Sequence, residues 1–311
     1  MASPSKIYNM LFFGLALLIT TSLCAQYKNY SPNLKPLIAD QEGHQQWKDL
    51  TAQYKEEGIT KENIQARLKV IKPLVKKNPK WADGRWLIAN LYMQLGETVS
   101  AEDEESKAIA RNMLVKAQKH SELCLKLDRN LDICKFFLGA AIGKIATIDG
   151  IVASLGKGKQ ILDLWNEVVE GKQQYIFDDG YSLQSLVHYG LGIFYRVVPD
   201  FFILRWVLGF SGDIDKSVEM HRKAVKLPGG GGTCSYLMLT AALLCQADGE
   251  LTNESKNLIS EIKEMKSDGD SESICKRDAL KLESKPEDGC GYTKAQQQER
   301  SEEAMKAKLK K

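Results

Sequence analysis

The feature that most constrains this 311-residue chain is a recurring pair of helical patterns, clearest over residues 186–228. In the first pattern Leu191 and Tyr195 lie four residues apart, and in the second Ser217 and His221 do, so each pair shares one helix face. The small residues Gly192 and Ala224 let the two helix axes approach closely. The turn Gly212-Asp213 leads into the second helix. The stretch predicts a helical hairpin, which must bury its apolar face against neighbouring hairpins.

Similar pairs recur along the chain at an irregular spacing of about 45 to 50 residues, within the range of helical repeats. First helices are expected within residues 47–58, 81–97 and 132–142, and a further hairpin within 235–266. Lys, Glu, Leu and Ala dominate the composition and only 8 prolines are present, which favours helix throughout. The sequence predicts an all-α fold, an α-solenoid of about five stacked helical hairpins over residues 46–267.

The series resembles the tetratricopeptide repeat, in particular the divergent branch that includes periplasmic TatT-like proteins associated with TRAP transporters and the regulators of microtubule dynamics. The resemblance rests on Leu138-Gly139 and on the stretches 191–200 (LGIFYRVVPD) and 212–228 (GDIDKSVEMHRKAVKLP). It covers roughly residues 46–265. It implies an interior that accommodates a ligand, and a partner binding protein. Arg129, where the repeat usually has Pro, and the long inserts depart from the regular pattern.

The N-terminus has the features of a targeting segment. Lys6 precedes an uncharged apolar run over residues 10–23, which is shorter than a membrane span needs. We expect residues 1–25 to be a signal peptide cleaved near Cys24 or Ala25, and the chain to be exported, either periplasmic or secreted. A lipid-modified Cys24 and an uncleaved anchor remain alternatives, and only an uncleaved segment would contact a membrane.

The segments that flank the predicted repeats are polar. Residues 26–45 contain two prolines and are expected to form a polar tether. Residues 268–311 are expected to form a C-terminal charged extension.

Removal of the leader leaves six cysteines, an even number that suits disulfides in an exported chain: Cys124, Cys134, Cys234, Cys245, Cys275 and Cys290. We favour a Cys124–Cys134 pair because these residues flank a turn between two helices. Cys234 and Cys245 cannot pair with each other, since eleven residues of helix would separate them by roughly 16 Å. Pairing of Cys275 and Cys290, with each other or with Cys234 or Cys245, stays open, as does a set of free thiols.

No pattern in the chain indicates catalysis, a cofactor, a metal ion or nucleic acid. The run Gly156-Lys157-Gly158-Lys159 lacks the spacing, the Ser/Thr and the preceding strand of a phosphate-binding loop, so it predicts a turn between helices. The four histidines are isolated, and His221 is expected to be a packed core residue. The net charge of +3 is nearly balanced, which gives no electrostatic footprint for nucleic acid.

The remaining candidate site is a groove formed by first helices, with side chains between residues 85–94 and 186–196 and an aromatic insert over residues 201–210. Two interpretations of the insert stay open: a folded-back helix that buries its apolar stripe, or a groove lining, partner surface or membrane-contacting loop. The candidate groove residues are His188, Tyr189, Tyr195 and Trp206.

The sequence therefore predicts a non-enzymatic, exported scaffold that binds a protein partner or an apolar small ligand. The alternatives are a small-molecule-binding accessory component of a transport system and a membrane-anchored cytoplasmic scaffold. A deep apolar cavity would favour a small ligand, and a shallow groove would favour a protein partner.

Overall fold

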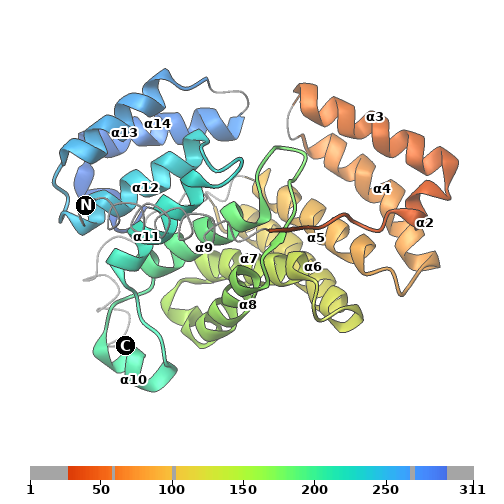
Figure 1. The fold of residues 1–311 in the computed structure, drawn as a ribbon, viewed down its shortest axis with the longest axis horizontal. Helices are drawn as coiled ribbons and strands as arrows, with labels where there is room; N and C mark the ends of the chain where they lie inside the picture. Colours follow the sequence, from red (N-terminus) through yellow and green to blue (C-terminus); the bar gives the residue numbers. More distant parts are fainter. Residues whose placement is uncertain (1–26, 58–59, 100–102, 267–269, 293–311) are drawn as a thin grey trace, which may run out of the picture.

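The computed structural model describes residues 27–57, 60–99, 103–266 and 270–292, and these residues form an almost entirely helical array (Figure 1). Five consecutive hairpins make up most of this described part: α3 (Gln41–Glu57) with α4 (Lys61–Lys77), α5 (Ala82–Glu97) with α6 (Glu104–Leu127), α7 (Asp132–Asp149) with α8 (Gly158–Gly171), α9 (Leu183–Val197) with α11 (Ile214–Lys226), and α12 (Thr233–Gln246) with α13 (Asn253–Glu264). The all-α helical-repeat class predicted from the sequence is confirmed.

Shorter elements join and flank the hairpins. They are α2 (Lys35–Ile38), the 3-10 helix η1 (Val152–Lys157), α10 (Phe202–Leu208), α14 (Asp270–Ser284) and the 3-10 helix η2 (Pro286–Gly289). Strands β1 (Lys28–Asn29) and β2 (Gln173–Gln174) pair in parallel. The run predicted as a turn at residues 156–159 lies where η1 joins α8.

Local sequence explains where many helices begin. Five helices start after a side chain that accepts a hydrogen bond from the backbone N–H three residues on: Thr60, Asp103, Ser182, Asp213 and Thr252. Proline has the opposite tendency inside a helix, yet α4 continues through Pro73 to Lys77. Leu74 and Val75, which follow the proline, are buried and so favour the helical last turn.

The close approach of paired helices depends on glycine opposite a large ring. A Cβ at Gly192 of α9 would lie 2.6 Å from two atoms of the His221 ring on α11, so only glycine fits without displacement. The Ser217 hydroxyl donates to the Gly192 carbonyl at 2.7 Å. In the preceding hairpin Gly139 lies against Trp165, whose indole N–H donates to the Phe136 carbonyl at 3.2 Å. His221 is thus a packed residue of a helix–helix interface, as predicted.

The segment predicted as a polar tether is instead packed against the helices. Lys28 and Asn29 pair with β2, and Leu37 is fully buried. The Tyr30 hydroxyl donates to the Asp83 carboxylate, which also accepts from the Asn33 backbone N–H at 3.1 Å. The expectation failed because the partners of these polar residues lie on α5, about 50 positions later, where no local pattern reveals them.

The segment predicted as a charged extension also belongs to the array, as far as it is described. Ala279 and Leu282 of α14 are buried against α12, and the Tyr292 hydroxyl donates to Asp278 at 2.8 Å. The buried Arg196 guanidinium of α9 donates to the Gly289 carbonyl at 2.7 Å. A core that extends to residue 292 replaces the predicted boundary at residue 267.

Three disulfides cross-link the described part. The predicted Cys124–Cys134 pair is present, with Cα atoms 5.9 Å apart, and it ties α6 to α7. Cys234 and Cys245 bond not to each other but to Cys275 and Cys290 respectively, which fastens α14 and η2 to α12. Three disulfides are typical of an exported protein. The predicted signal peptide lies outside the described residues, and none of the helices that the structure describes is both long and apolar enough to cross a bilayer.

Candidate functional site

A large cavity, partly open to solvent, is lined by one face of each of α3, α5, α7 and α9, with α14 at one side; its volume is about 2330 Å³. Each of these helices contributes side chains at helical spacing, and both stretches expected to line a groove, 85–94 and 186–196, take part. Ordinary small-molecule sites measure roughly 300–1,000 Å³, so this cavity has room for an elongated occupant.

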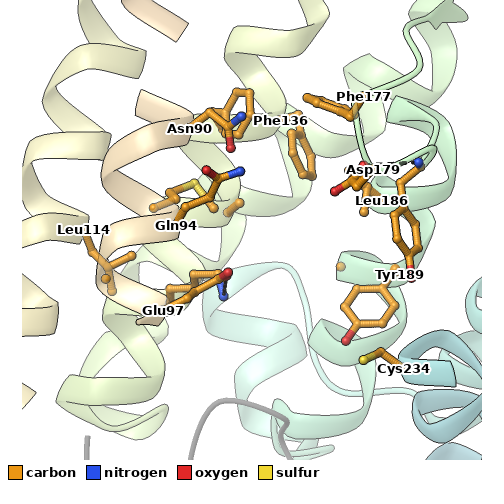
Figure 2. Close-up of a pocket in the computed structure, with 18 of the residues that line it drawn as sticks. Asn90, Gln94, Glu97, Leu114, Phe136, Phe177, Asp179, Leu186, Tyr189 and Cys234 are labelled. Carbon is orange, nitrogen blue, oxygen red and sulfur yellow. Dashed lines mark hydrogen bonds and ion pairs between the residues drawn. The ribbon is translucent and has the colours of Figure 1, made fainter. Parts of the chain in front are cut away.

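A polar stripe on α5 forms one side of the cavity. Asn90, Gln94 and Glu97 lie four and three residues apart, and Figure 2 shows them opposite Asp179, Leu186 and Tyr189. The Gln94 side-chain oxygen is buried and accepts no hydrogen bond from any described residue. Glu97 is paired with the Lys144 ammonium at 2.6 Å. The stripe thus combines the Glu97 carboxylate, which is paired with Lys144, with the Gln94 amide, whose oxygen has no hydrogen-bond donor among the described residues.

Aromatic rings form a second wall. Trp86 stacks on Phe137 with ring centroids 5.8 Å apart, and Tyr175 meets Phe177 edge to face at 4.8 Å. Phe136 contacts both Phe137 and Phe177. Edge-to-face packing of this kind fixes ring orientations, so this wall is rigid as well as apolar.

The loop between β2 and α9, residues 175–182, spans the cavity between the two ends of the array (Figure 1). On one side Asp178 lies 3.6 Å from the Arg67 guanidinium of α4. On the other side the Tyr181 hydroxyl donates to Glu272 of α14 at 3.4 Å. These contacts hold the loop in place from both directions.

Burial alters the acid–base properties of groups around the loop. The pKa of the Asp179 carboxyl is raised, mainly by burial and then by the neighbouring Asp178 carboxylate. Burial, followed by the Asp179 charge, raises the pKa of Tyr54 to about 12. Arg67 stacks on the Trp47 ring at 4.5 Å, and burial lowers its pKa while Asp178 opposes the change. The cavity therefore holds carboxylates close to aromatic faces, an arrangement suited to binding polar and cationic groups of an occupant.

Only one of the four groove residues predicted from the sequence lines the cavity. Tyr189 does so, and it packs against the cluster that contains Cys234. His188 is buried elsewhere, with Nδ1 2.9 Å from the Gln184 carbonyl, and burial lowers its pKa. Tyr195 packs against Phe194, with the Lys216 ammonium over its ring, while Trp206 is 80% exposed on α10.

The reason for this outcome is the rotation of α9. Positions 188 and 195 lie seven apart and share one face, whereas the cavity is lined by Leu186, Tyr189 and Ile193 on another. The predicted stretch 85–94 includes Asn90 and Gln94 without singling them out, and sequence reasoning missed Glu97 and the loop of residues 175–182. The i, i+4, i+7 spacing of Asn90, Gln94 and Glu97 was a signal that could have revealed the stripe.

His221 packs behind Tyr189, one of the side chains that line the cavity. His221 is 1% exposed, and neither ring nitrogen has a hydrogen-bond partner among the described residues. Burial, followed by the Arg196 charge, lowers its pKa to about 3, so the ring is neutral at physiological pH. Its contacts are with Gly192 and, edge to face, with Tyr189. Within the described ranges no group of three potential metal ligands is found.

Neither a scan against protein-family models nor a search of curated proteins finds a match to this chain. The likeness to the tetratricopeptide repeat therefore remains a prediction from the residues.

Proposed function

We propose that this chain is a non-enzymatic, exported scaffold of tetratricopeptide-like hairpins that binds an extended segment of a protein partner in its central cavity. The observation that carries this proposal is the cavity itself, about 2330 Å³ and lined by four successive first helices. Because its lining comes from four helices that follow one another along the array, the cavity suits an extended chain better than a compact ligand.

The α5 stripe supports a peptide occupant. A side-chain amide offers both a donor and an acceptor, as the peptide group does, and the Gln94 oxygen is free to accept a backbone N–H. The aromatic wall of the cavity supplies apolar contact for side chains of the bound segment. An unused buried acceptor costs free energy in the empty protein, so a donor from a ligand would be favoured there.

A second candidate is an apolar small ligand, which would make the chain an accessory component of a transport system. The part of the cavity near the end of α9 favours it, because Ile151, Phe194, Val197 and Phe210 are apolar and line that part. A long amphiphile would suit both regions, with its polar end at the α5 stripe.

Export with cleavage near Cys24 or Ala25 is part of the proposal. The three disulfides support it, since structural disulfides are rare in the cytosol, and they argue against a cytoplasmic scaffold. N-terminal sequencing of the protein from its own source tests the cleavage, and retention of residues 10–23 would contradict it.

Native mass spectrometry of the disulfide-intact protein from its own source tests binding. An Ala140→Trp variant fills the cavity from α7, and Ala108→Trp is a matched control on an exposed position of α6 outside it. We expect a co-purifying peptide, partner or amphiphile to be lost from Ala140→Trp and retained by Ala108→Trp. Equal retention by both variants would contradict binding in the cavity, and the mass of the occupant distinguishes the two candidates.

A further inference from the structure

Helix α10 carries the most exposed large apolar side chains of the described residues. Phe202 and Trp206 are 81% and 80% exposed, and Val207 is 61% exposed. The next most exposed, Ile38, reaches 53%. Figure 1 shows α10 at the lower edge of the molecule, projecting away from the hairpins. The three side chains thus form a convex apolar tip.

The base of this tip is firmly built, so its orientation is set by the fold. Phe210 is buried against Phe194, with ring centroids 5.7 Å apart, and Leu208 packs on the same core. The Arg205 guanidinium donates to the Ser211 hydroxyl and lies 3.3 Å from Asp200. Helical geometry then places Phe202 and Trp206, four residues apart, on the face that points outward.

The size and residue types of the tip fit a bilayer better than a protein partner. Three side chains with these exposures present on the order of 400 Å² of apolar surface. A stable protein interface needs about 800 Å² from each partner, and a convex tip would need a matching hollow. Tryptophan and phenylalanine are also the side chains that enter the boundary between headgroups and acyl chains.

Charge around the base complements anionic headgroups. Gly158 packs against the Phe210 ring, which brings the neighbouring Lys157 and Lys159 to the base of the tip. Both lysines are exposed, and Lys157 takes part in no ion pair among the described residues. Lys159 forms an ion pair with Asp163. The one carboxylate within residues 200–210, Asp200, is paired with Arg205. Residues 156–159, which lack the features of a phosphate-binding loop, therefore place two lysines at the base of the tip.

We propose that the α10 tip inserts Phe202, Trp206 and Val207 into the interface of a bilayer that contains anionic phospholipids, with Lys157 and Lys159 at the headgroups. Val198 and Phe210 line the cavity and also lie at the base of the tip, so docking places that end of the cavity beside the membrane. The insertion stands independently of what the cavity binds.

Tryptophan fluorescence gives a direct test, because Trp206 is exposed while Trp47, Trp81, Trp86 and Trp165 are each at most 9% exposed. The full disulfide-intact chain is mixed with vesicles of phosphatidylcholine and phosphatidylglycerol, with and without brominated acyl chains. We expect the emission to shift to the blue and the brominated lipid to quench it. A Trp206→Phe variant should bind and lose the quenching.

A Phe202→Ser/Val207→Ser variant retains Trp206 and should bind these vesicles at least about tenfold more weakly, since burial of one Phe side chain contributes at least that much. Ile38→Ser is the matched control and should bind as the parent does. Lys157→Glu should weaken binding to the mixed vesicles and not to phosphatidylcholine alone. All variants share one N-terminus, so residues 10–23 contribute equally to each.

Unquenched Trp206 at saturating vesicle concentration would overturn the assignment. An equal loss of binding in the Ile38→Ser control would do the same. Native mass spectrometry that shows the Phe202→Ser/Val207→Ser variant losing a second copy or a partner, with vesicle binding unchanged, would assign the tip to a protein interface instead.

Discussion

The Arg67 guanidinium of α4 lies 3.6 Å from the Asp178 carboxylate and so links the first hairpin to the loop that spans the cavity. Arg67 is buried and stacks on Trp47, whereas Asp178 is 44% exposed. Part of the guanidinium hydrogen-bonding capacity is unused, since its Nε has no partner among the described residues. The Arg67–Asp178 ion pair therefore contributes to the stability of the fold and also holds the loop of residues 175–182 against the cavity.

Replacement of Asp178 by Asn should therefore cost about 1–2 kcal/mol of unfolding free energy. The change removes the counter-charge of a buried cation, and the exposure of Asp178 reduces the cost below that of a fully buried pair. Asp163→Asn, in the exposed Lys159–Asp163 pair, is the control and should cost less than about 0.5 kcal/mol. Urea denaturation measures both values. Hydrogen exchange should also become faster over residues 175–182 in Asp178→Asn only.

Gly192→Ala should destabilise the fold by about 1–3 kcal/mol, because the new methyl group would overlap the packed His221 ring. Gly156→Ala is a matched control, since a Cβ at that position meets no atom within 4 Å. Thermal and urea unfolding of the two variants give the comparison. Equal stability of the two would show that the α9–α11 interface relaxes around the methyl group.

The buried, neutral His221 predicts a loss of stability in acid. Its pKa in the folded protein is about 3, below the value of about 6.5 for an unfolded histidine, so the unfolded chain binds the proton first. The contribution of His221 is complete above pH 6.5 and decreases as the pH falls towards 3, by roughly 1.4 kcal/mol per pH unit. His221→Phe keeps a ring of similar shape and should have a smaller slope of unfolding free energy between pH 6 and 4. A slope identical to that of the parent would contradict this role.

Disulfide mapping by mass spectrometry without reduction should find Cys124–Cys134, Cys234–Cys275 and Cys245–Cys290. The Cys234–Cys275 bond joins residues 41 positions apart. A Cys234→Ser/Cys275→Ser variant should lose about 3–4 kcal/mol of unfolding free energy, by the loop-closure estimate. The Cys124–Cys134 separation is 10, so its removal should cost about 1 kcal/mol less. Six free thiols in the native protein, or any other pairing, would rule out this arrangement.

The cavity illustrates how far the sequence could be interpreted. Leu186, Tyr189 and Ile193 share one helix face on spacing alone, and so do His188 and Tyr195, so both faces were possible linings. Burial decided between them, since His188 lies within the core while Tyr189 faces the cavity. Trp206 was separated from both because α10 projects outward instead of folding back over the hairpins.

By itself the sequence determined the helices, their pairing into hairpins and the Cys124–Cys134 bond. All of these follow from contacts between near neighbours in the chain: helical periodicity, side chains that cap a helix start, and a short turn. The tertiary structure decided that Lys28 and Asn29 pair with β2 while Tyr30 and Asn33 bond to α5, that α14 completes the core through two disulfides, and which face of α9 lines the cavity. These depend on contacts between residues about 40 or more positions apart, which no local pattern specifies because the free energy that selects them arises only when distant surfaces meet.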